Sequence, residues 1–76
     1  METDTPIKSL IDRWPSRKAL ADETGAPEAN VHKWAKNGRI PSGWQNAVLI
    51  AASRRGWDDV TPAWMIAAHA TDGRAA

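Results

Sequence analysis

The stretch Arg17–Lys36, RKALADETGAPEANVHKWAK, decides the fold of this 76-residue chain. Ser16 stands just before it, where its hydroxyl can cap the start of a helix. Gly25 interrupts it at a point where a helix would end on a residue with positive φ, which glycine adopts without a steric clash. The stretch therefore predicts two short helices, at 17–24 and at about 27–37, joined by a tight turn.

The apolar positions of this pair have the spacing of a helix-turn-helix, a unit whose second helix enters the DNA major groove. Ala21 and Gly25 are four residues apart, Val31 follows six residues later, and Trp34 follows three residues after that. Ala21 is small at the point where the two helices would cross, while Val31 and Trp34 would face the core. We therefore expect a helix-turn-helix with 27–37 as its recognition helix.

Apolar residues at helical spacing predict three further helices around this pair. They cover about 6–14, 43–55 and 62–70. Ser42, followed three residues later by Gln45, predicts a capping box at the start of the second of these helices. The last helix is apolar nearly all round, so it is expected to be buried on every side or covered by a partner.

The length of the chain allows one small domain only. Such a domain buries about 60% of its extended surface, so its core is marginal. Five tryptophans, with no phenylalanine or tyrosine, offset this limit, because each indole buries roughly 150–250 Å². We predict an all-α class: a compact bundle of about five short helices, with a disordered start at 1–4, a single domain at 5–70 and a flexible tail at 71–76.

Composition and motifs argue against several classes of function. The chain has no cysteine, and His32 and His69 are far apart with no clustered carboxylates, so no metal or cofactor is expected. It has no Ser-His-Asp or Cys-His arrangement, no phosphate-binding loop and no dinucleotide fingerprint, so no enzyme is expected. It has no long apolar run and no signal-peptide core, which predicts a cytoplasmic protein without a membrane partner.

Charge is distributed unevenly although the net charge is only +1. Residues 17–55 hold seven basic and three acidic side chains, an excess of four positive charges, and the flanking segments are slightly acidic. An uneven distribution of this kind is typical of proteins that bind a polyanion. The alternative, a solvated basic face with no partner, fits the charge pattern equally well.

The chain resembles a known family in three places. Residues 17–36 resemble the helix-turn-helix of phage Cro and repressor proteins, the XRE-type regulators. The run Trp34–Pro41, WAKNGRIP, is similar to the W-x-x-x-G-R-I-P segment of small Cro-like, YdaS-like and carph-isopro regulators, and residues 56–62 also fit that group. The resemblance covers roughly 7–66. It implies a lambda-repressor-like fold and a sequence-specific DNA-binding transcriptional regulator, encoded by a phage or its bacterial host.

Positions in the recognition helix imply contacts to base edges. Lysine can donate to guanine, His32 can donate or accept, and Glu28 can accept from cytosine, although Glu28 equally suits the helix dipole. The chain departs from the family at Pro27, where a hydroxyl residue is common, and at Ala29, where a polar residue is common. Base reading would therefore rest on few side chains. The expected base contacts are Glu28, Ala29, His32, Lys33 and Lys36.

Phosphate contacts are expected from the start of the 17–24 helix, which normally abuts the DNA backbone, and from the end of the recognition helix. The pair Arg54-Arg55 is interpreted as a partner for the C-terminal dipole of its own helix rather than as a DNA contact. The expected phosphate contacts are Ser16, Arg17, Lys18, Asn37 and Arg39.

A small DNA-binding module of this kind reads few base pairs, so it is expected to bind as a homodimer to two half-sites about one helical turn apart. An alternative function is a protein-interaction module that keeps the helix-turn-helix scaffold and binds another regulator or RNA polymerase through its apolar last helix. A third reading is that the chain's own tail covers this surface. The residues expected on the dimer or partner surface are Ile50, Trp64, Met65 and Ile66.

Overall fold

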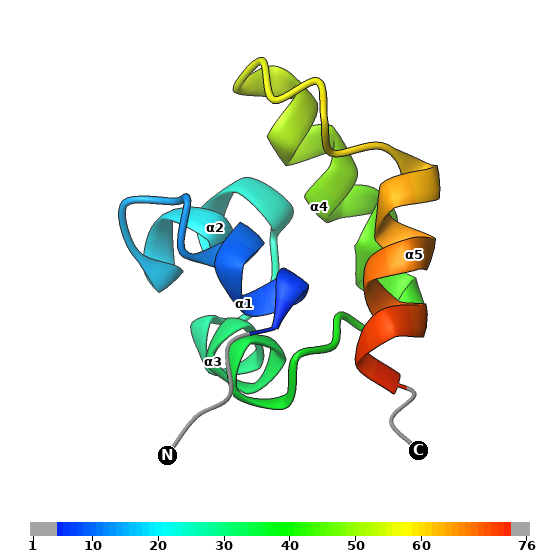
Figure 1. Cartoon of the computed structure of the whole chain (residues 1–76). Helices are drawn as coiled ribbons and strands as arrows, with labels where there is room; N and C mark the ends of the chain where they lie inside the picture. The colour runs from blue at the N-terminus through cyan, green and yellow to red at the C-terminus, as the bar shows by residue number, and fades with distance from the viewer. Residues whose placement is uncertain (1–4, 74–76) are drawn as a thin grey trace.

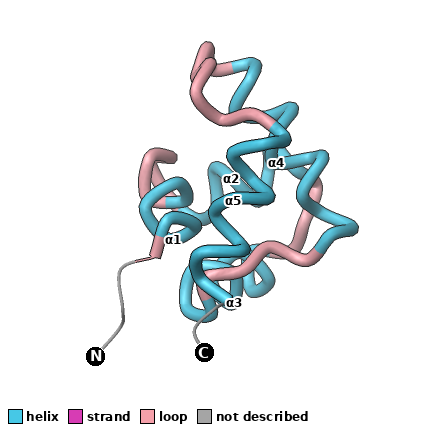
Figure 2. Tube along the Cα trace, turned by 45° about the vertical axis from the view of Figure 1, so that its right-hand side comes forward, coloured by secondary structure: helices cyan, strands magenta, loops and turns pink. Residues whose placement is uncertain are grey.

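A computed structural model of the chain describes residues 5–73, with side chains described up to residue 69. Five helices make up the fold, and Figure 2 shows only helices and loops over the described residues. The all-α class predicted from the sequence is confirmed. The expected disordered start at 1–4 and the end of the tail at 74–76 lie outside the described residues. The helices are α1 (Pro6–Ile11), α2 (Arg17–Thr24), α3 (Glu28–Asn37), α4 (Ser42–Arg54) and α5 (Pro62–Gly73).

Helices α1 and α2 make the main packing contacts between helices. Helix α2 packs against α3 and α4, and α1 packs against α3 and α5. In Figure 1, α1, α2 and α3 lie on one side of the molecule and α4 and α5 on the other. All five helices contribute to one apolar core. Its largest fully buried side chains are Ile7, Leu10, Ile11, Leu20, Val31, Ile40, Val48 and Met65.

Most helix ends follow the local signals in the sequence. The hydroxyls of Thr5, Ser16 and Thr61 each accept a hydrogen bond from the backbone amide three residues later, at 3.1, 3.1 and 3.0 Å. Gly25, at φ 81°, ends α2, and Gly38, at φ 70°, ends α3. Both glycines occupy the left-handed region; Gly25 does so in the turn between α2 and α3, and Gly38 at the start of the connector to α4.

Helix α1 is shorter than its apolar pattern predicts, because it ends at Ile11 instead of continuing to Trp14. The chain tightens there, since the backbone amide of Trp14 donates to the carbonyl of Ile11 at 3.2 Å, three residues back. The tighter turn accompanies the packing of Trp14 against Trp57, with ring centroids 4.7 Å apart and planes at 76°. Pro15 disfavours the helical conformation at Trp14, and the packing of the indole against Trp57 occurs at the same place.

The predicted capping box at the start of α4 is wrong. Ser42 is the first residue of the helix, and Pro41 occupies the cap position with no side-chain capping bond. The Nε2 amide of Gln45 donates instead to the carbonyl of Ile40, at 2.8 Å. Ile40 is buried in the core, and Gln45 satisfies a carbonyl that would otherwise lose its water.

Helix α5 is tied to the connector between α3 and α4 by His69. The backbone amide of Ile40 donates to Nε2 of His69 at 2.9 Å, and Nδ1 of His69 lies 2.8 Å from the carbonyl of Met65. Because a carbonyl can only accept, the proton of the neutral ring is on Nδ1. Helix α5 continues to Gly73, so residues 71–73 belong to the helix rather than to the expected tail.

Arg55 lies at the C-terminal end of α4, as the sequence interpretation requires, and it also makes a tertiary contact that the sequence did not predict. It is the C-terminal cap residue of α4, and its guanidinium forms a two-pronged ion pair with Glu23 of α2. The guanidinium of Arg55 also packs against two indole rings, at 5.9 Å from the ring centroid of Trp14 and 5.7 Å from that of Trp57. Trp14 also donates from Nε1 to Glu23 at 3.0 Å. These four residues therefore join α2 to the end of α4.

Acid should weaken this junction. The hydrogen bond from Arg55 lowers the pKa of Glu23 below its usual 4.5, with a smaller contribution from Trp14. The folded state therefore holds the proton less tightly than the unfolded state, so the stabilisation is present above that value and is lost as pH falls. We expect the Tm difference between the parent chain and Glu23→Gln to narrow between pH 7 and pH 3 in thermal melts. A constant difference across that range would contradict the assignment.

Candidate nucleic-acid interface

Helix α3 separates its apolar and polar side chains onto different faces. Val31, Trp34 and Ala35 lie in the core, and the turn at Gly25 packs this side of the helix against α2. The opposite side is open to solvent. All five residues predicted to touch bases lie on this helix with exposed side chains: Glu28, Ala29, His32, Lys33 and Lys36.

Two of these residues already contact each other. Nε2 of His32 lies 3.4 Å from a carboxylate oxygen of Glu28, one helical turn away. Both side chains are more than half exposed, and such pairs contribute only about 0.3–0.5 kcal/mol. The contact is therefore weak enough to yield to a ligand that binds either side chain.

The start of α2 is less available for phosphate than its sequence predicts. Arg17 forms an ion pair with Asp12 at 2.7 Å, and Lys18 forms one with Asp22 at 3.1 Å. The hydroxyl of Ser16 caps the helix by accepting from a backbone amide. All three expected phosphate contacts here thus have a partner within the chain, and a DNA backbone would have to compete with it.

Helix α3 and its exit are different, because their positive charges have no ion-pair partner among the described residues. Among the nine lysines and arginines of residues 5–73, the ones in ion pairs are Lys8, Arg13, Arg17, Lys18 and Arg55. The other four make no ion pair within the described part of the chain. Three of these, Lys33, Lys36 and Arg39, lie on α3 or just after it, and Arg54 lies at the end of α4. Available positive charge is therefore concentrated at α3 and its exit.

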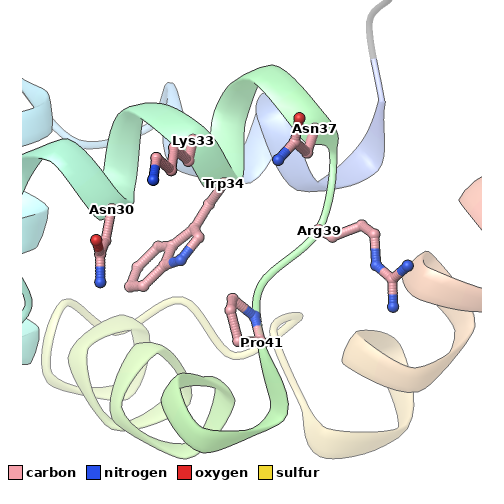
Figure 3. Close-up of a pocket in the computed structure, with 6 residues that line it drawn as sticks. All are labelled: Asn30, Lys33, Trp34, Asn37, Arg39 and Pro41. Atoms are coloured by element: carbon pink, nitrogen blue, oxygen red, sulfur yellow. The ribbon is translucent and has the colours of Figure 1, made fainter.

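A groove of about 420 Å³ lies beside this helix, and the sequence reasoning did not identify it. Figure 3 shows the side chains that line it from α3 and from the following connector. A signal was present in the sequence, because four of these residues have the i, i+3, i+4, i+7 spacing of one helix stripe. The lining residues are Asn30, Lys33, Trp34, Asn37, Arg39 and Pro41.

The apolar surface predicted for a partner is smaller than expected. Met65 is only 1% exposed, so its side chain belongs to the core and is not available for docking. Ile66, the next residue along α5, is 70% exposed. Trp64 is half-buried, and Ile50 on α4 is 46% exposed. Ile50 and Ile66 are therefore the exposed large hydrophobic side chains among the described residues.

Comparison of the chain with known protein families, with curated proteins and with solved structures finds no match. No helix in the described range has both the length and the hydropathy to cross a membrane. The same range contains no group of three histidine, cysteine or acidic side chains placed to hold a metal ion. The charge and the groove around α3 are therefore the features on which a functional proposal rests.

Proposed function

We propose that this protein is a sequence-specific DNA-binding transcriptional regulator of the Cro or repressor type, cytoplasmic and encoded by a bacterium or its phage. One observation carries the proposal: three of the four unpaired cations in the described chain gather on α3 and its exit. Among the other described arginines and lysines, all except Arg54 form an ion pair within the chain. DNA is a polyanion, and it offers phosphates to such a surface at regular spacing.

The position of α3 supports the same proposal. It is the second of two short helices joined by a tight glycine turn, and the side chains expected to touch bases are exposed on it. In a helix-turn-helix, the corresponding helix lies in the major groove and reads base edges. His32, Lys33 and Lys36 would be the reading side chains, while Arg39 and Asn37 would contact phosphate at the end of the helix.

A ten-residue recognition helix reads few base pairs, so we propose that two copies bind adjacent half-sites. The exposed side chains of Ile50 and Ile66 are the candidate contacts between the copies. The same two side chains favour a second candidate function, in which α5 binds another regulator or RNA polymerase and DNA is not bound. The two functions differ in one measurable property, which is affinity for DNA.

Selection from a pool of random double-stranded DNA, repeated across a salt series, tests the proposal. We expect an enriched motif and an affinity that falls steeply with salt, by roughly 0.9 log units per log unit of salt for each phosphate contacted. Binding without an enriched motif would remove the sequence-specific part of the proposal. No retention of DNA at about 50 mM salt would favour the protein-interaction function.

A further inference from the structure

The groove beside α3 is lined by polar side chains that have no hydrogen-bond or ion-pair partner among the described residues. Within the described part of the chain, the side chains of Asn30, Lys33, Asn37 and Arg39 make no hydrogen bond or ion pair. Asn30 is also half-buried, so its amide loses part of its water without a protein partner in return. A concave site with an apolar floor and a few converging, unpartnered polar groups is the usual form of a small-molecule site.

The side chains are distributed along the groove in a definite order. Figure 3 shows Asn30 at one end and Arg39 at the other, with Trp34 and Pro41 between them. Trp34 is 3% exposed, so it can form part of the floor but offers no open face for stacking. Cationic and apolar groups therefore alternate with amides over the length of the groove.

Each of these groups has a matching chemical partner. A side-chain amide carries two donors and one acceptor, which match the donor and acceptor edge of a heterocyclic base. The guanidinium of Arg39 presents a planar fork that suits a phosphate, and Lys33 adds a second positive charge. Pro41 is exposed and suits the apolar face of a ring or a sugar, while Trp34 contributes only to the floor. A ligand that uses all these groups is anionic, planar at one end and small.

We propose that this groove binds a small anion of the nucleoside monophosphate class, with its phosphate toward Arg39 and its base edge toward Asn30. The groove volume of about 420 Å³ lies within the range of roughly 300–1,000 Å³ typical of small-molecule sites. Lys33 lies between the two ends, where it contacts the phosphate or the sugar oxygens.

Binding in the groove has a consequence for DNA, and this part rests on the proposed function. Lys33, Asn37 and Arg39 line the groove and are also among the expected DNA contacts. A nucleotide that engages them competes with DNA for the same side chains. The free concentration of the nucleotide would then set how much protein is available to occupy its operator.

Calorimetric titration of the full chain with AMP and with GMP tests the site, with adenosine and inorganic phosphate as separate arms. We expect at least one nucleotide to bind more tightly than either of its parts. Asn30→Ala and Arg39→Ala should each weaken that binding by at least about tenfold. Asn46→Ala and Arg54→Ala are the matched controls, since both side chains are exposed on α4 and outside the groove, and they should leave the affinity unchanged.

Three outcomes overturn the site: no heat from either nucleotide up to about 1 mM, equal affinity for inorganic phosphate, or equal losses in the α4 controls. Competition is measured separately, by adding the nucleotide to the complex with selected DNA. Asn30→Ala should keep DNA binding but lose displacement by nucleotide. If the chain binds nucleotide and no DNA, the proposed function fails and the site stands. If it binds DNA and no nucleotide, the reverse holds.

Discussion

Replacing Lys33 and Lys36 together with alanine is expected to weaken binding to double-stranded DNA by at least about tenfold, and to reduce the salt slope by about 2. The two ammonium groups have no ion-pair partner within the described chain, so their loss removes charge that is otherwise available to phosphates or guanines. Both side chains are exposed, and the variant should therefore keep its helical circular dichroism. Filter binding or fluorescence anisotropy across a salt series measures both effects.

Arg54→Glu is the matched control, because it changes the net charge by the same two units at a site away from α3. A loss of affinity due to overall charge alone would appear equally in both variants. A loss due to the reading surface appears mainly in the lysine variant. If the lysine variant retains DNA as well as the parent chain does, α3 is not the recognition helix, and the free charge on it has another role.

Replacing Trp14 with alanine should be the most damaging single change to stability. The indole is 3% exposed, lies against Trp57, and is hydrogen-bonded to Glu23 beneath Arg55. Deleting a buried tryptophan costs about 3–5 kcal/mol, while a chain of this length has about 4–11 kcal/mol in total. We expect Tm to fall by more than about 10 °C, or the chain to be largely unfolded, in thermal melts followed by circular dichroism.

Trp64→Ala is the matched comparison, because Trp64 is half-buried and lies outside the contacts that join α2 to α4. Its replacement should cost clearly less than that of Trp14. Trp14→Phe should recover part of the loss by filling most of the volume, although it cannot donate to Glu23. Equal losses for Trp14→Ala and Trp64→Ala would show that the Trp14 contacts do not carry the stability assigned to them.

The fold was predictable where local chemistry decides it. Hydroxyl residues began three helices, and glycines ended α2 and α3, since these signals act within a few residues. Prediction failed where a distant residue decided the outcome. Trp14 lies outside α1 and packs against Trp57. Gln45 does not form the predicted capping box and donates instead to the carbonyl of buried Ile40. The apolar periodicity of these helices does not reveal the contacts with Trp57 and with the carbonyl of Ile40.

The position of the candidate site was predictable from the sequence, but which of its positive charges are free of ion pairs was not. The exposed face of α3 follows from the 100° step between its residues, so its members could be named from the sequence. A count of charges along the sequence does not distinguish cations that form ion pairs within the chain from those that do not. Folding pairs Arg17 with Asp12 and Arg55 with Glu23, and leaves Lys33, Lys36 and Arg39 unpaired. The pairing of Arg55 joins residues 32 positions apart, so no local spacing in the sequence reveals it.

Four of the five tryptophans form two separate pairs that can serve as optical reporters, and Trp64 lies outside both pairs. Trp14 and Trp57 form one pair at the junction of α2 and α4, while Trp34 and Trp44 form another, with ring centroids 6.0 Å apart, beside the groove. Since Trp34 lines the groove, events at α3 should change emission from the second pair and leave the first nearly constant. Selective replacement by phenylalanine would assign each signal, so binding and unfolding can be followed independently without an added dye.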